Sequence, residues 1–218
     1  MTQLVNRLRS RLYAGGAPDA GTTLMEMLVG MAIMVIFGGI FTTSIVLMTS
    51  SSTKAEALAT TSSQLSTAFQ RMDKSIRYAS AVSTPGVSAG TGTTGDWYVE
   101  FRTTNTGTEV CTQLRVDQTS KQLQMRSWKP VSSVATSLTS WVPWTNNITN
   151  GGVASTSADV PFILLPSKSS VSFQQLRVTL VAVSGSPPTT SRSSLTLPAL
   201  NTSATTTSTN VCGEAGRP

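Results

Sequence analysis

The chain has 218 residues, a formal net charge of +6, and charged side chains at only 12% of its positions. It contains no histidine, which excludes His-based triads, His metal sites and acid–base catalysis by histidine. Its two cysteines have no metal-site spacing, and no glycine-rich loop follows a predicted strand and opens a helix to bind phosphate. We therefore expect a protein that is not an enzyme and holds no cofactor or metal.

Residues 1–21 form a short basic segment without an apolar core of its own. Three arginines outnumber a single acid there. An ordinary secretory signal places its apolar region before the cleavage site, whereas here the apolar region follows Gly21. The arginines predict that this end stays in the cytoplasm and that the chain from Lys54 onward lies outside.

A lone carboxylate, Glu26, lies five residues after Gly21. No charged side chain occurs between Met27 and Thr53. An apolar stretch of about 20 residues is enough for a helix to cross a bilayer. A charged side chain at the centre of such a helix costs roughly 2.5–3.5 kcal/mol even on the mildest scale. The sequence therefore predicts that Glu26 is functional.

The junction, which reads GTTLME, resembles the type III signal of type IV pilins and pseudopilins. That signal combines a short basic leader, a glycine at the cleavage site and a glutamate at the fifth mature position. The resemblance covers residues 1–80. It implies that prepilin peptidase, which is also an N-methyltransferase, cuts after Gly21 and methylates the new amino group of Thr22. The family usually has phenylalanine where this chain has Thr22, whereas Leu24 fits the family pattern.

The same resemblance implies an assembly role for Glu26. The amine of Thr22 and the carboxylate of Glu26 are four residues apart and can share one helix face. In a filament, the amine of one subunit would meet the carboxylate of its neighbour, and the paired charges would offset each other's burial. Glu26 can also act as a helix cap, which the macrodipole favours. The alternative for residues 22–50 is an uncleaved helix that anchors the chain by crossing the membrane once.

A second helical stretch follows the apolar one. Residues 54–80 contain no proline or glycine, and apolar residues recur there at helical spacing: Leu58, Leu65, Phe69, Met72 and Ile76. We expect one continuous helix over 24–79 whose second half packs on a sheet. The resemblance implies an α+β, pilin-like fold, in which a long N-terminal helix with a membrane-spanning first half packs on an antiparallel β-sheet head. The expected organisation has five parts. Residues 1–21 are a cleaved leader, 22–50 a transmembrane or filament-core helix, and 51–80 its amphipathic extension. Residues 81–200 form a β-rich head, and 201–218 form a tail.

Alternation of apolar and polar residues predicts the strands of the head. The clearest strands are 97–102, 110–116, 121–128 and 176–183. The short link between 110–116 and 121–128 predicts that these two strands form a hairpin. Less regular candidates are 138–144, 160–165 and 195–200, and Pro143 and Pro161 predict sheet edges or strand starts. Asp96 and Glu100 are predicted to lie on solvated faces. The Ser- and Thr-rich tail from Asn201 is predicted to be poorly ordered.

Two sets of residues in the head predict further contacts. In an exported domain we expect Cys111 and Cys212 to form a disulfide rather than remain as two unpaired thiols. Basic residues of the predicted hairpin and a nearby tryptophan suit contacts to DNA phosphates and stacking on a base: Arg115, Lys121, Arg126 and Trp128. The alternative is that these basic residues simply keep a sheet face soluble.

The expected function is structural. The chain is predicted to be a minor pilin or pseudopilin of a type IV pilus or a type II secretion-like filament, assembled through its N-terminal helix. Its expected partners are prepilin peptidase, other pilin or pseudopilin subunits, an inner-membrane assembly platform and, through the hairpin, DNA. It would span the cytoplasmic membrane once, with an extracytoplasmic head, before entering an extracellular filament. The alternative is a membrane-anchored extracellular module that binds DNA or a surface polymer and does not polymerise.

Overall fold

The computed structural model describes most of the chain after the leader. The described residues are 24–88, 95–104, 107–130, 138–165, 167, 171–186 and 188–212. The predictions for Gly21 and Thr22 lie outside these residues. The chain divides into two compact units, Met1–Ser51 and Ser52–Pro218.

Helix α2, Leu24–Ile76, crosses the boundary between the two units. In the first unit, its large apolar residues between Leu24 and Met48 are 48% to 79% exposed. The hydroxyl groups in this part bond to carbonyls one turn earlier; those of Thr42 and Thr43 donate to Gly38 and Gly39 at 2.8 Å. Such local bonds satisfy polar groups within the helix itself, so a polar side chain does not interrupt the apolar surface.

The second half of α2 has the predicted apolar stripe. Leu65, Phe69, Met72 and Ile76 are buried at the predicted spacing, whereas Leu58 is 36% exposed. The helix ends at Ile76 rather than at residue 79, because strand β1 begins at Ala79. The stripe is buried because it faces the sheets of the head, as an amphipathic helix requires.

The first sheet is antiparallel. Among the described residues its order is β1-β3-β4-β5-β6, and β2 also pairs with β3. Its strands are Ala79–Val82 (β1), Gly86–Val87 (β2), Trp97–Thr103 (β3), Val110–Asp117 (β4), Gln122–Trp128 (β5) and Val142–Thr145 (β6). The predicted hairpin joins β4 to β5, with Asp117 opposite Gln122, and Lys121 adopts a positive φ of 55° in its turn. As predicted, Pro143 lies in an edge strand, β6.

The second sheet is also antiparallel and has the order β7-β8-β9 in the described part of the chain. Its strands are Phe162–Leu165 (β7), Gln174–Ser184 (β8) and Thr189–Ala199 (β9). Pro161 immediately precedes β7, as predicted for a strand start. The last strand begins at residue 189 rather than at the predicted residue 195. Residues 189–194 are polar and show no apolar alternation, but they pair with β8 and so extend the strand.

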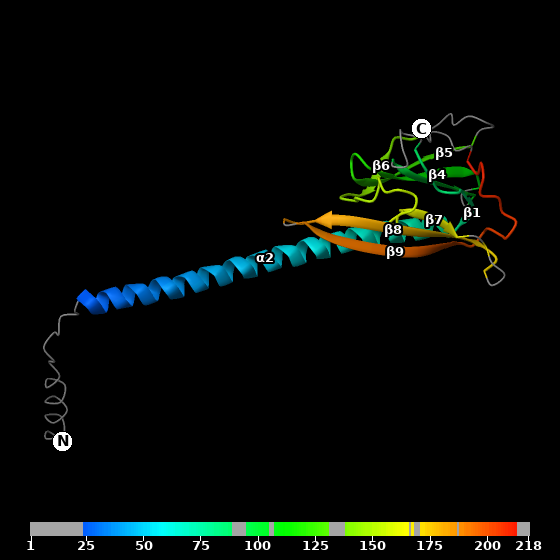
Figure 1. Ribbon diagram of the computed structural model, residues 1–218. Helices are drawn as coiled ribbons and strands as arrows, with labels where there is room; N and C mark the ends of the chain where they lie inside the picture. Colours follow the sequence, from blue (N-terminus) through cyan, green and yellow to red (C-terminus); the bar gives the residue numbers. More distant parts are fainter. Residues whose placement is uncertain are drawn as a thin grey trace, which may run out of the picture. The chain divides into compact units, whose positions relative to one another are not determined.

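One hydrophobic core joins the second half of α2 to both sheets. Val99 of β3, Leu114 of β4 and Leu176 of β8 are each fully buried in it. Figure 1 shows β8 and β9 as long neighbouring strands in one sheet and β4 and β5 in the other. The α+β fold with a long N-terminal helix and antiparallel sheets is therefore as predicted.

The prediction that the tail from Asn201 is poorly ordered is wrong for residues 201–212. The amide of Thr84 donates to the carbonyl of Ser208 at 2.8 Å, and Val211 and Cys212 are buried. Buried Gln174 donates to the carbonyl of Thr206. The tail is ordered because these contacts and a disulfide join it to the head, which a Ser- and Thr-rich composition does not reveal.

Candidate functional site

Glu26 lies in the first turn of α2 and is exposed. It is the one acidic residue of that turn, where the partial positive charge of the helix N-terminus favours a carboxylate. The apolar residues that follow it up to Met48 are also exposed. This arrangement fits both predicted roles of Glu26, because an exposed carboxylate can cap its own helix and still meet a neighbouring chain.

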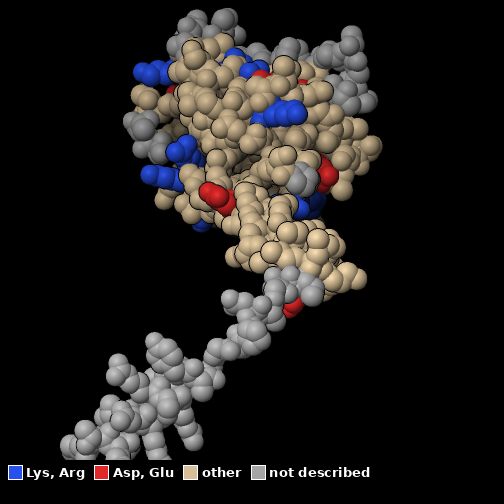
Figure 2. All heavy atoms as spheres, turned by 90° about the vertical axis from the view of Figure 1, so that its left-hand side faces the viewer, with Lys and Arg blue, Asp and Glu red and all other residues tan. Residues whose placement is uncertain are grey.

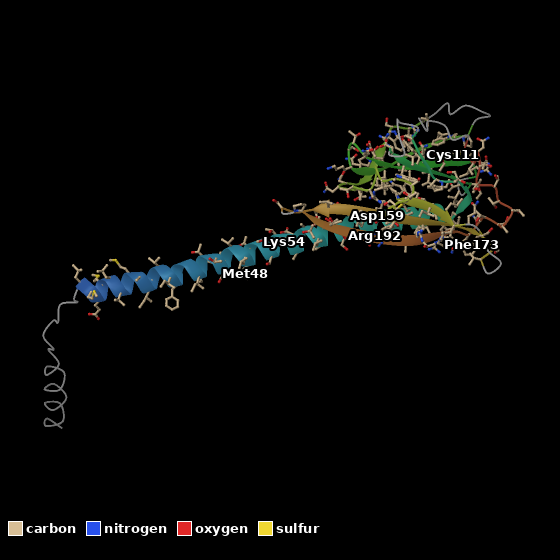
Figure 3. All side chains as sticks on the ribbon, in the orientation of Figure 1. Met48, Lys54, Cys111, Asp159, Phe173 and Arg192 are labelled. Carbon is tan, nitrogen blue, oxygen red and sulfur yellow. A yellow bond between two sulfur atoms is a disulfide. The ribbon has the colours of Figure 1, made fainter. Side chains whose placement is uncertain are left out.

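The large apolar residues of α2 from Leu24 to Met48 form an extended exposed surface. Monomeric soluble proteins rarely expose a contiguous apolar patch of more than a few hundred Å². By length and composition, α2 is the one described helix able to cross a membrane, with a mean hydropathy of 2.2 over its most apolar window. Figure 3 shows Met48 near the end of this apolar part and Lys54, the next charged residue, close behind it. The polar–apolar boundary of the helix lies between them.

A buried polar cluster covers the face of the first sheet that is turned away from the core. Glu100 of β3, Gln113 of β4 and Arg126 of β5 are direct neighbours in register. The Glu100 side chain accepts hydrogen bonds from the Ser83 hydroxyl at 2.7 Å and from Gln113 Nε2 at 2.6 Å. Gln113 Oε1 accepts one from Arg126 Nε at 2.7 Å. The four side chains therefore form a connected network across three strands and the end of β1.

The prediction that Glu100 lies on a solvated face is wrong, because it is fully buried. Period-2 alternation correctly assigns Glu100 to the face opposite Val99, but it does not say whether another segment covers that face. The segment before β6 brings Trp141 to it, with its ring centroid 6.3 Å from that of Tyr98. Asp96 is only half-buried, and its Oδ1 accepts a hydrogen bond from the amide of Gln118.

Trp141 contacts two of the arginines predicted to bind DNA. The guanidinium carbons of Arg115 and Arg126 lie 4.2 and 4.3 Å from its ring centroid, within the range of cation–π attraction. Arg115 also pairs with Asp117 at 3.1 Å and with Asp96 at 3.6 Å. Burial lowers the pKa of Arg126. Both cations therefore already have partners within the head.

The other two residues of the predicted DNA site are Lys121 and Trp128. Lys121 is exposed in the β4–β5 turn, and Trp128 is only 3% exposed. Figure 2 shows Lys and Arg side chains separated by uncharged surface on the face it presents, without a continuous basic patch. The structure thus brings Arg115 and Arg126 together at Trp141. It buries Trp128, the residue predicted to stack on a DNA base. DNA contact stays a prediction.

The structure joins Cys111 to Cys212 by a disulfide, with the two Cα atoms 5.8 Å apart. Cys111 lies on β4 opposite Trp128 of β5. These side chains form a small apolar cluster with Ala81 and Val211, separate from the main core. The disulfide thus fixes the C-terminal segment to the middle of the first sheet.

Sequence reasoning missed Trp141 and the network of Glu100 and Gln113. No local signal marks them, because Trp141 reaches the sheet from a loop and the network depends on register between strands. Among the described residues, no group of three or more Cys, Asp or Glu side chains is placed to hold a metal ion. The hydrogen bonds of the polar cluster join β3, β4 and β5 to the end of β1.

No family model matches the chain, and no curated protein or solved structure matches it either. A long N-terminal apolar helix on antiparallel sheets is a pilin-like layout, and the apolar part of that helix is able to span a membrane.

Proposed function

We propose that the chain is a minor pilin or pseudopilin, a structural subunit of a type IV pilus or a type II secretion-like filament. The observation that carries the proposal is the exposed apolar half of α2 with Glu26 in its first turn. The same helix continues into the core of a β-rich head. A membrane anchor alone accounts for the apolar length, but a carboxylate at that position, five residues after a glycine, is explained by assembly.

In the proposed cycle, prepilin peptidase cuts after Gly21 and methylates Thr22. The subunit stays in the cytoplasmic membrane through α2, with its N-terminus cytoplasmic and its head outside. An inner-membrane assembly platform then transfers it into the filament. There, the Thr22 amine of one subunit and Glu26 of its neighbour form an ion pair in a medium of low dielectric, where an unpaired charge is strongly unfavourable. This pairing sets the register between subunits.

The size of the head supports a minor role. The unit that begins at Ser52 contains two sheets and a disulfide-linked C-terminal segment. Such a head suits a subunit of the tip, of initiation or of adhesion. The competing proposal is a membrane-anchored module that binds DNA or a surface polymer and does not polymerise; the pairing of Arg115 and Arg126 within the head does not favour DNA as its ligand.

The test is mass spectrometry of the mature N-terminus combined with fractionation of sheared filaments. We expect a protein that begins at Thr22 and carries one added methyl group. Gly21→Ala should strongly reduce processing, because the protease must fit the residue before the cut in a tight site. An unchanged mature mass in this variant would refute the cleavage assignment.

Glu26→Gln separates assembly from processing, because it keeps the shape of the side chain and removes its charge. We expect cleaved protein that accumulates in the membrane and is depleted from filaments. Breaking a buried ion pair from one side costs roughly 3–5 kcal/mol. Glu56→Gln is the matched control, since Glu56 is an exposed glutamate on the same helix within the second unit. If Glu26→Gln enters filaments as well as the control does, Glu26 is only a helix cap.

A further inference from the structure

The loop between β6 and β7 contains the one Asn–Gly pair of the sequence, Asn150–Gly151. Asparagine is a chemically labile residue, and deamidation begins when the main-chain nitrogen of the next residue attacks its side chain. Glycine has no side chain to hinder that attack. Every other asparagine of this chain precedes a residue with a side chain. Asn150 is therefore the asparagine most prone to deamidation.

The side-chain amide of Asn150 uses all of its hydrogen-bonding groups. Asn150 is 2% exposed, and its Nδ2 donates to the carbonyls of Asp159 at 2.8 Å and Thr179 at 2.9 Å. Its Oδ1 accepts a hydrogen bond from the amide of Val181 at 3.2 Å. Thr179 and Val181 belong to β8, whereas Asp159, labelled in Figure 3, lies shortly before β7. This one side chain therefore joins β8 to two parts of the loop that leads into β7.

Gly151 packs directly on the main chain of the β4–β5 hairpin. It is buried, and a Cβ atom at this position would lie 2.9 Å from the main-chain nitrogen of Gln118 and 3.1 Å from the carbonyl oxygen of Val116. These are main-chain atoms of a paired hairpin, so they cannot move aside as the end of a flexible side chain can. The fold therefore requires glycine here and asparagine before it, although together they form a labile pair.

Deamidation of this pair proceeds in two steps. The main-chain nitrogen of Gly151 loses its proton to a base such as hydroxide and attacks Cγ of Asn150. The bond from Cγ to Nδ2 breaks, ammonia leaves after taking a proton from water, and a succinimide ring forms. A water molecule then opens the ring at one of its two carbonyls, which leaves aspartate or isoaspartate.

The native head opposes both steps. When Nδ2 leaves, its hydrogen bonds to Asp159 and Thr179 must break. Ring closure also draws Gly151 away from its close packing on Gln118. Burial of the pair excludes the water that opens the ring. The reaction therefore proceeds through opened states, and its native rate is the rate in the unfolded chain multiplied by the opened fraction.

Neither product fits the native contacts. An ionised aspartate only accepts hydrogen bonds, so it would place an oxygen against the carbonyl oxygens of Asp159 and Thr179. A buried polar group in that position loses its hydration without gaining a hydrogen bond. Isoaspartate adds a carbon to the main chain, which displaces Gly151 from a space beside Gln118 that admits only glycine.

We propose that Asn150 is a site of spontaneous deamidation that the native head protects, and that the reaction makes prolonged unfolding of the head irreversible. The reaction consumes only water and needs a base, so no enzyme or partner takes part. This inference concerns the second unit alone and does not depend on cleavage at Gly21 or on filament assembly.

The first test compares full-length protein in detergent micelles with the same protein unfolded in urea, at one mildly alkaline pH. Peptide mass spectrometry follows the gain of about 1 Da that accompanies replacement of an amide by a carboxyl group. We expect the rate at Asn150 to be at least about tenfold lower in the native protein, because buried groups react only in the opened fraction. Asn147 is exposed and precedes the branched Ile148, so it is the internal control and should react slowly in both samples.

The second test measures refolding. Protein kept in urea for increasing times is diluted into micelles, and the refolded fraction, followed by tryptophan fluorescence, should fall in step with the fraction of intact Asn150. Asn150→Asp should lower the equilibrium constant for folding about 5- to 150-fold, the range expected when buried polar groups lose their partners. Asn146→Asp is the matched control, since exposed Asn146 accepts a hydrogen bond from Gln122 through an oxygen that aspartate keeps.

The proposal is overturned if Asn150 reacts as fast in the native protein as in urea, or no faster than Asn147 in urea. It is also overturned if the deamidated protein refolds completely, or if Asn150→Asp is as stable as Asn146→Asp. Should Asn150→Asp not fold at all, the refolding series of the unaltered protein still decides, because it starts from a sequence that folds.

Discussion

Removal of the disulfide should destabilise the head substantially. We consider the double substitution of Cys111 and Cys212 by alanine. The bond closes a loop across a sequence separation of 101 residues, for which the loss of chain entropy in the unfolded state gives about 4.7 kcal/mol. That value is an upper bound, because residual structure in the reduced, unfolded chain lowers the entropy that the bond removes. We expect a loss of about 2–4 kcal/mol, the usual range for a native disulfide.

The assay is denaturant unfolding of the full-length protein in detergent micelles, followed by tryptophan fluorescence. Trp128 is a suitable probe, since it is buried in the same cluster as Cys111 and Cys212. The unfolding midpoint should fall in the double variant, and reductant should lower the midpoint of the unaltered protein similarly. Reductant should have no effect on the double variant, which serves as the control. A loss below about 1 kcal/mol would refute the entropic reasoning.

Two other predictions concern charged groups of the first sheet. Glu100→Ala should lower the free energy of unfolding by about 1–3 kcal/mol, because it leaves the buried side-chain nitrogen of Gln113 without its acceptor; Glu100→Gln, which keeps one acceptor oxygen, should cost less in the same measurement. Burial alone would raise the pKa of Asp117, but hydrogen bonds from the Ser120 and Thr119 amides and the charge of Arg115 lower it overall. Its contribution to stability is therefore fully present above the ordinary pKa of 3.8 and is lost as pH falls through the lower folded-state pKa. The unfolding free energy of Asp117→Asn should depend less on pH in this acidic range than that of the unaltered protein.

Local patterns predicted the regular elements well. The apolar stripe of Leu65, Phe69, Met72 and Ile76 identified the buried face of α2, because helical spacing alone determines which side chains share a face. The β4–β5 hairpin followed from two alternating runs joined by a short polar link. Boundaries were less accurate: β9 extends over polar residues from Thr189, where pairing with β8 sustains a strand that composition does not favour.

The sequence by itself determined the long helix, the uncharged stretch from Met27 to Thr53, the position of Glu26 just before it, and the β4–β5 hairpin of the head. These features depend on short-range spacing and on the physical cost of a charge among apolar residues. Only the tertiary structure decided that Glu100 is buried, that Trp141 contacts both Arg115 and Arg126, and that residues 201–212 are ordered. It also revealed the buried contacts of Asn150 and Gly151. Alternation shows which residues share a face, but coverage of that face depends on segments distant in sequence.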